Sequence, residues 1–167
     1  MSAEGDGDLR VRVSTSLKAI PAAAWNACAN PRALRAAAQA ADDDCAGEAG
    51  GDPLSARDDD NPFVSHEFLS ALEDSGCTGG RSGWSPAYLM VEDAAGRLLA
   101  AAPSFLKSHS QGEYVFDHSW ADAYQRAGGR YYPKLQLAAP FTPATGPRLL
   151  VADGPREDEA RAALKAA

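Results

Sequence analysis

The densest run of polar and aromatic side chains lies between residues 107 and 124 and contains two of the three histidines, His109 and His118. An imidazole beside a carboxylate suits general acid–base chemistry, provided that a substrate proton comes within hydrogen-bond reach. Asp117 and His118 are adjacent, so on a strand their side chains would face opposite sides. Asp122 lies four residues after His118, which is one turn of a helix. We therefore predict His118 and Asp122 as the catalytic pair.

The same run of residues admits two other interpretations. A metal-dependent hydrolase built on His109, Asp117 and His118 would need their side chains to converge on one ion. The run has neither H-x-x-x-H nor H-E-x-x-H spacing, so we predict no bound metal. The remaining interpretation is structural, with the polar side chains forming a network at a strand end and a helix start.

Basic and aromatic residues alternate just downstream, around Gly128-Gly129. Basic side chains beside glycine backbone suit a phosphate, and tyrosine rings suit a planar or cyclic group. The glycine pair matches neither the dinucleotide fingerprint nor the P-loop, which leaves a solvated turn with packed tyrosines as the alternative. The residues that we predict to bind substrate are Asp117, Trp120, Tyr124, Arg130, Tyr131, Tyr132 and Lys134.

A mixture of strands and helices must position these side chains. Apolar and polar residues alternate from Leu9 to Thr15, which predicts a half-buried strand. Phe68 and Leu72 lie on one face of a predicted helix capped by Ser65, and we expect both in the core. Two apolar runs joined by a turn at 93–96 predict a central hairpin. Further predictions are a short helix at 21–25, strands at 113–116, 131–139 and 148–151, and helices at 120–127 and from 157 onward.

These elements predict an α/β or α+β fold with a mixed, mainly antiparallel sheet flanked by helices. We divide the chain into a first strand and helix (1–34), an acidic insert rich in Ala, Asp and Gly (35–60) and a main domain (61–167). The insert has no aromatic residue and too little apolar surface to order itself, so we expect it to be disordered and dispensable.

The net charge of −7 is local, because residues 42–60 contain eight acidic side chains and only one arginine. The other acidic and basic residues balance, which argues against nucleic-acid binding. We see no apolar run long enough for a membrane span and no secretory signal. Three widely spaced cysteines favour a reducing compartment. We therefore expect a cytoplasmic protein, with a plastid as the alternative in a eukaryote.

Four strings of this sequence carry a resemblance to a known family: NPFVSHEFLSALE (61–73), KSHSQGEYVFDHSWADAY (107–124), GGRYYPK (128–134) and PFTPATGPRLL (140–150). They resemble the FemAB-like family of the acetyltransferase (GNAT) superfamily, which is described as peptidoglycan biosynthesis or recognition. The resemblance implies transfer of an acyl or aminoacyl group to an amine, with acyl-CoA or an aminoacyl donor. The acceptor would be a small molecule or a peptide.

Two departures qualify what the resemblance implies. Members of the family have two acetyltransferase-like halves, and this chain resembles the first. The pyrophosphate loop [Q/R]-x-x-G-x-[G/A] has no match, because Gln125–Arg130 fails at its last position. We therefore expect the N-terminal part of an N-acyltransferase, inactive as a fragment without its C-terminal half. The alternative is a non-catalytic binding or regulatory module that has the same fold.

Overall fold

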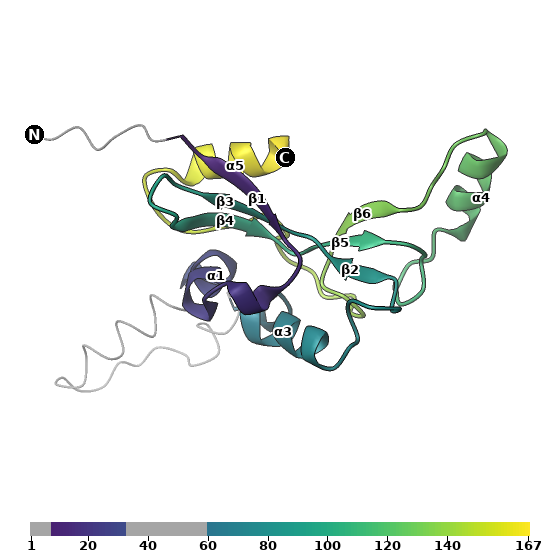
Figure 1. The fold of residues 1–167 in the computed structure, drawn as a ribbon, viewed down its shortest axis with the longest axis horizontal. Coiled ribbons are helices and arrows are strands. Elements are labelled where there is room, and N and C mark those ends of the chain that lie inside the picture. The colour runs from purple at the N-terminus through teal and green to yellow at the C-terminus, as the bar shows by residue number, and fades with distance from the viewer. Residues whose placement is uncertain (1–7, 33–59) are drawn as a thin grey trace, which may run out of the picture.

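Two antiparallel sheets form the framework of the computed structural model, which describes residues 8–32 and 60–167 (Figure 1). The four-stranded sheet has the order β1 (Arg10–Ser14), β3 (Tyr88–Glu92), β4 (Leu98–Ala102), β7 (Leu150–Val151). The three-stranded sheet has the order β2 (Trp84–Pro86), β5 (Ser104–Lys107), β6 (Lys134–Leu137). The helices are η1 (Leu17–Ala19), α1 (Ala22–Ala29), η2 (Pro62–Val64), α3 (His66–Asp74), α4 (His118–Arg126) and α5 (Glu157–Ala166). The predicted α+β fold is confirmed.

One long hairpin runs through both sheets and bends between them. Residues Ala87 and Pro103 separate β2 from β3 and β4 from β5. Ser104, which is fully buried, holds the bend: its hydroxyl donates to the carbonyl of Ala87 and accepts from the backbone N–H of Leu89 at 3.2 Å. The three-stranded sheet therefore starts from a fixed point at the end of the main core.

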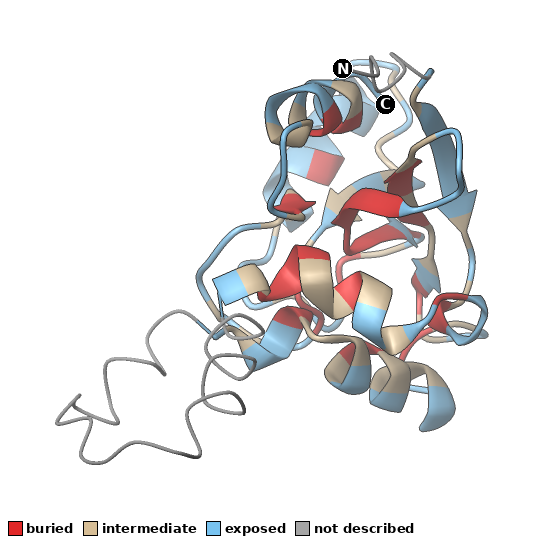
Figure 2. Cartoon of the chain, turned by 90° about the vertical axis from the view of Figure 1, so that its left-hand side faces the viewer, coloured by how far each residue is buried: buried red, intermediate tan, exposed pale blue. Residues whose placement is uncertain are grey.

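Helices cover both faces of the four-stranded sheet (Figures 1 and 2). On one face, Trp25 of α1 meets Tyr88 at 5.5 Å, and Tyr88 meets Phe105 at 5.6 Å, each ring edge to face. The Trp25 indole donates to the carbonyl of Val64 at 2.8 Å, so its buried N–H is satisfied. On the other face, α5 packs Ala160 and Leu164 against β4 and β7, together with Val91 of β3.

The predicted hairpin is confirmed, and all five residues of β4 are buried. The helix capped by Ser65 is confirmed as well, since the Ser65 hydroxyl accepts from the N–H of Phe68 at 3.2 Å. The expected core positions are only partly right. Leu69 is the fully buried residue of α3, whereas Phe68 and Leu72 are half-buried on either side of it.

The predicted strand at 113–116 is wrong, because these residues form no strand and three of them are largely exposed. Glu113 is half-buried instead, and its carboxylate accepts from the ammonium of Lys134 at 3.1 Å. The first strand is confirmed, but Val11 and Val13 are exposed, because α5 packs mainly on β3, β4 and β7 and β1 is the edge strand beyond them. β6 is shorter than expected, since it begins only at Lys134, after Pro133.

The N-terminal elements join the rest of the fold directly: β1 pairs with β3, and α1 contacts β4 and β7. The predicted insert at 35–60 lies outside the described residues, except for Asp60. Among the described residues, no helix has both the length and the apolar character that a membrane span requires.

Candidate functional site

Residues 108–133 form an arm that projects from the three-stranded sheet between β5 and β6, with α4 at its outer end (Figure 1). α4 begins directly after Asp117 and ends before Gly128, whose φ of 84° closes the helix. Ala121 is the buried residue of α4, so the helix presents most of its surface to solvent. Most of the predicted site residues therefore lie outside the main core.

The carboxylate of Asp117 is the centre of a polar cluster at the base of this arm. Its Oδ2 accepts from the Tyr131 hydroxyl at 2.7 Å and from the Lys134 ammonium. Its Oδ1 accepts from Ser110 and, at 3.3 Å, from Tyr132. Desolvation opposes ionisation of this carboxyl, but the hydrogen bonds from Lys134, Ser110 and Tyr131 outweigh it and hold the pKa of Asp117 well below its usual value. Asp117 is therefore an ionised anchor and a poor base.

Two lysines and a second carboxylate complete the cluster. Lys134 donates to Glu113 at 3.1 Å, and the ammonium of Lys107 lies 3.8 Å from the same carboxylate. Lys107 is fully buried, its Nζ lying 3.6 Å from the centre of the Trp84 ring and donating to the Gln111 carbonyl at 3.0 Å. Burial lowers the pKa of Lys107 to about 8. Two cations thus face two anions, and little net charge remains for a ligand.

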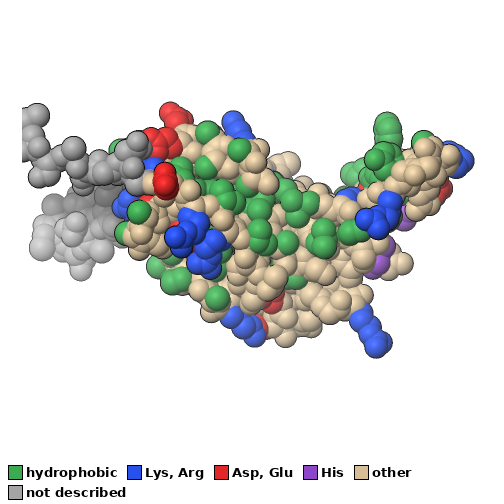
Figure 3. Space-filling view, turned by 45° about the horizontal axis from the view of Figure 1, so that its top comes forward, with side chains coloured by type: hydrophobic (Ala, Val, Ile, Leu, Met, Phe, Trp, Pro, Cys, Tyr) green, Lys and Arg blue, Asp and Glu red, His purple; other side chains and the backbone are tan. Residues whose placement is uncertain are grey.

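The arm also carries four exposed aromatic rings, which we call the aromatic rim: Tyr114, Phe116, Trp120 and Tyr124. The exposed fraction of the Trp120 residue is 73%, and apolar side chains gather at the projecting end of the molecule in Figure 3. Tyr124 reaches back to Tyr131 at 6.2 Å, edge to face. This contact requires glycine at 129, because a Cβ there would lie 2.3 Å from the Tyr124 ring. The rim is therefore joined to the polar cluster through these two rings.

A family model described as FemAB-like, peptidoglycan biosynthesis/recognition, matches residues 16–167. The match covers the three-stranded sheet, the arm, the helices and every strand of the four-stranded sheet except β1. The chain belongs to the FemAB-like family. No curated protein and no solved structure matches it. The family places the chain in peptidoglycan biosynthesis or recognition, as the resemblance in the sequence suggested.

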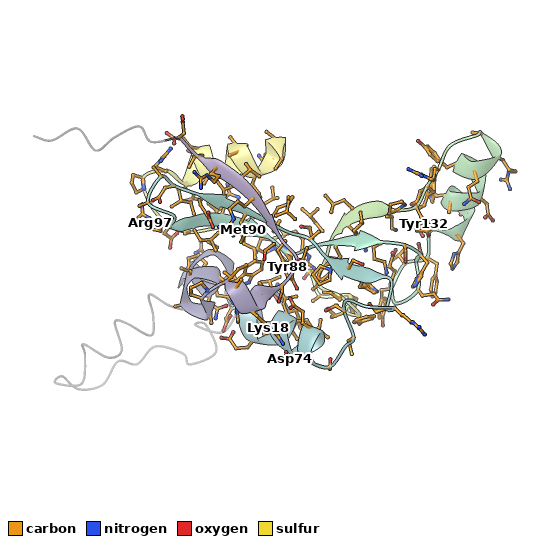
Figure 4. All side chains as sticks on the ribbon, viewed as in Figure 1. Lys18, Asp74, Tyr88, Met90, Arg97 and Tyr132 are labelled. Carbon is orange, nitrogen blue, oxygen red and sulfur yellow. The ribbon has the colours of Figure 1, made fainter. Side chains whose placement is uncertain are left out.

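In this FemAB-like chain, four of the predicted substrate-binding residues come together in the polar cluster: Asp117, Tyr131, Tyr132 and Lys134. Figure 4 shows Tyr132 at the base of the arm. Trp120 and Tyr124 lie on the aromatic rim, and Arg130 is exposed beside it.

The predicted catalytic residues, unlike four of the predicted substrate-binding residues, do not belong to the polar cluster. His118 and Asp122 are both exposed on α4, and no hydrogen bond or ion pair joins them within residues 8–32 and 60–167. The His118 imidazole instead stacks on Phe116, with ring centres 5.5 Å apart and planes at 13°. The structure thus leaves His118 accessible from solvent.

Sequence reasoning missed Ser110, Lys107 and Trp84 as members of the site. The pairing of β2 with β5 and of β5 with β6 brings Trp84, Lys107 and Lys134 into one register row. The sequence held a signal for Lys107, because it lies two residues after Phe105 and alternate residues of a strand share a face. On β5, Phe105 and Lys107 are buried and Leu106 between them is exposed. No feature of the sequence near Ser110 predicted its contact with Asp117.

The residues proposed above for a metal do not converge. His109 packs on Gly83, where a Cβ would lie 2.2 Å from the imidazole, and its Nδ1 accepts from the backbone N–H of Gln111 at 3.2 Å. The described part of the chain has no group of three or more His, Cys, Asp or Glu side chains placed to hold an ion. His66 is structural, with its Nε2 at 3.0 Å from the Ile20 carbonyl.

Proposed function

We propose that this chain supplies the acceptor-binding surface of an N-acyltransferase that passes an acyl or aminoacyl group to the amine of a small molecule or peptide. The observation that supports this proposal is the polar cluster around Asp117 with the aromatic rim beside it. Exposed aromatic rings on a projecting helix are typical of a binding surface, because isolated folds rarely leave several large rings in water. The FemAB-like match makes a peptidoglycan-related acceptor the natural candidate.

The tyrosines of the cluster can offer the hydrogen-bond acceptors that an amine requires. Tyr131 and Tyr132 each donate a hydroxyl proton toward Asp117. Their oxygens keep lone pairs, which can accept from the N–H groups of an incoming amine. Asp117 fixes both phenols without itself becoming protonated at neutral pH, because its pKa is strongly lowered. The cluster would therefore orient the acceptor, and orientation is a main source of rate in group transfer.

Proton removal is the remaining step, and we assign it to His118 with Asp122 as its neighbour. The amine nitrogen forms a bond to the acyl carbon, the bond between that carbon and its carrier breaks, and the amine proton passes to His118. His118 is exposed and directly follows Asp117 in the chain, and we propose that the bound amine lies within reach of its imidazole. A positioned base of this kind contributes about 10²–10⁴-fold to the rate.

We propose the donor only as a class of molecule, namely a carrier of an acyl or aminoacyl group. Acyl-CoA would need cations for its pyrophosphate, but Lys107 and Lys134 are already paired with Glu113 and Asp117. The polar cluster around Asp117 therefore does not fit the phosphates of acyl-CoA, and we assign no step to that group.

The test is a titration of the 167-residue chain with an N-acetylmuramyl tripeptide that carries a free lysine amine. We expect saturable binding, weakened at least tenfold by Trp120→Ala, by Tyr131→Phe together with Tyr132→Phe, or by acetylation of the lysine amine. Val11→Ala is the matched control, since Val11 is exposed on β1 and lies outside the arm. Equal binding by the wild type and the arm variants would refute the proposal.

A non-catalytic binding module is the second candidate. It is favoured by the stacking of the His118 imidazole on Phe116, since no hydrogen bond joins His118 to Asp122 in the part of the chain that the structure describes. Turnover separates the two candidates. In a transfer assay on the protein encoded by the complete reading frame, His118→Ala should lower turnover by about 10²–10⁴-fold if His118 is the base. Unchanged turnover would remove the assigned base, and an absence of turnover alongside tripeptide binding would favour the module.

A further inference from the structure

A second concave site lies away from the arm, where the C-terminal end of α1, η2, the loop 144–149 and the start of α5 surround a cavity of about 720 Å³. In Figure 1, α1 and α5 are on the opposite side of the molecule from α4. This volume is within the usual range for small-molecule sites. The cavity joins two strings that the sequence analysis singled out and that the proposed acceptor site does not use: Asn61-Pro62-Phe63 and the segment 140–150.

Hydrogen bonds fix the walls of this cavity. The Asn61 side chain donates to the carbonyl of Thr145 at 2.9 Å and accepts from the N–H of Phe63 at 3.1 Å. Gly146 has a φ of 126°, and a Cβ there would lie 2.4 Å from Nδ2 of Asn61. Arg148 donates to the Gly146 carbonyl at 3.1 Å and to the carbonyls of two other loop residues. The loop is thus held open in one conformation, which makes the cavity preformed.

The lining of the cavity contains two kinds of residue. Ala29, Leu150 and Val151 are buried apolar residues of the lining. Charged residues of both signs line the rest, with two arginines and three carboxylates: Arg32, Arg161, Asp60, Asp153 and Glu157. A polyphosphate ligand such as a nucleotide or coenzyme A would meet more carboxylates than guanidinium groups. A ligand with one ammonium group and one carboxylate group would find partners for both.

We propose that this cavity binds a free amino acid or a short peptide through its ammonium and carboxylate groups, with an apolar side chain against the apolar residues of the lining. Arg161 is the proposed partner of the ligand carboxylate. Glu157, which pairs with Arg161 at 2.8 Å, would share that guanidinium with the ligand. The proposal is independent of the acceptor site on the arm, so the failure of one leaves the other standing.

The experiment is an NMR titration of the 167-residue chain with the dipeptide L-leucyl-L-alanine. We expect saturable shifts at the amides of Ala29, Thr145, Gly146 and Val151. N-acetylation of the dipeptide, or amidation of its carboxylate, should each weaken binding at least tenfold. ATP, as a polyphosphate probe, should leave these amides unshifted.

Three variants sharpen this test. Thr145 is exposed, and Thr145→Trp places a large ring at the cavity. The substitution keeps the hydrogen bond from Asn61, because that bond is to the backbone carbonyl of residue 145. It should abolish binding, and Arg161→Gln should weaken it at least tenfold. Lys165→Gln on the same helix does not line the cavity and should bind as the wild type does. Absence of saturable shifts at 10 mM dipeptide, shifts elsewhere only, or undiminished binding by Thr145→Trp would each overturn the proposal.

Discussion

The main core and the arm use aromatic residues in opposite ways. In the core, Trp25, Tyr88 and Phe105 have no exposed surface and pack edge to face between the sheet and α1. In the arm, Phe116 and Trp120 are 66% and 73% exposed. The core is thus stabilised by burial, whereas the arm depends on hydrogen bonds and ion pairs around Asp117. Substitutions that remove buried side chains should therefore act on the core, whereas substitutions that alter charge should act on the arm.

The largest expected effect is in the core. Phe105→Ala removes a fully buried ring that touches both Trp84 and Tyr88, and the cavity left behind adds to the lost transfer free energy. We expect the free energy of unfolding to fall by about 3–5 kcal/mol, measured by urea denaturation. A loss below about 1 kcal/mol would contradict the division between core and arm, because it would mean that the core does not depend on this ring.

The next effect concerns Lys107, which lies where the core meets the arm. Its pKa of about 8 is below the unfolded value near 10.4, so from pH 8 to 10.4 the unfolded chain holds more protons. This lysine therefore reduces stability at neutral pH, and the loss is recovered as the pH rises through that window. The recovery is at most about 3 kcal/mol.

The matched variant Lys107→Met isolates this contribution. Burial also raises the pKa of the Cys28 thiol to about 12, which lowers stability above pH 8.5 and opposes the lysine. The difference in unfolding free energy between wild type and Lys107→Met should therefore change in favour of the wild type from pH 8 to 10.4. A difference that stays constant across this range would show that Lys107 titrates normally in the folded protein.

Asp117 should give a smaller effect, and its pH dependence lies in the acid range. Asp117→Asn weakens the contacts to Lys134 and Tyr131, and hydrogen bonds to charged groups contribute about 1.5–3 kcal/mol each before exposure reduces them. We expect a loss of about 1–3 kcal/mol at pH 7. The folded pKa of Asp117 is lowered, so its contribution is complete above the unfolded value near 3.9 and is lost as the pH falls further, toward the folded value. Urea denaturation at pH 7 and pH 3 should show a smaller penalty for the variant in acid.

The core could be predicted from the sequence better than the arm. The apolar runs at 87–92 and 97–106 predicted the central hairpin, and Ser65 with its apolar stripe predicted α3, because burial leaves a periodic pattern. The strand predicted at 113–116 is wrong because that prediction also relied on apolar residues being buried. Its apolar letters suggested burial, but the polar cluster around Asp117 sets the conformation there and leaves Tyr114 and Phe116 exposed.

The candidate site was predicted in part. The local run around Asp117 was visible, and so were the tyrosines at 131 and 132. Their meeting with Lys107 and Trp84 depends on the register of the three-stranded sheet, in which Trp84 pairs with Lys107 and Lys107 with Lys134. Register between distant strands has no short-range signal, so this part of the site required the structure.

The smallest effect on stability should come from Trp120→Ala, although it is the largest change of side chain on α4. The ring is 73% exposed, so its removal should change the free energy of unfolding by no more than about 0.5 kcal/mol. Binding of the muramyl tripeptide should nevertheless weaken at least tenfold, because rings exposed at a binding surface contribute when a ligand covers them. Urea denaturation and calorimetric titration on the same protein separate the two quantities. A stability loss comparable to that of Phe105→Ala would show that the arm has a core of its own, and would remove the contrast between the two regions.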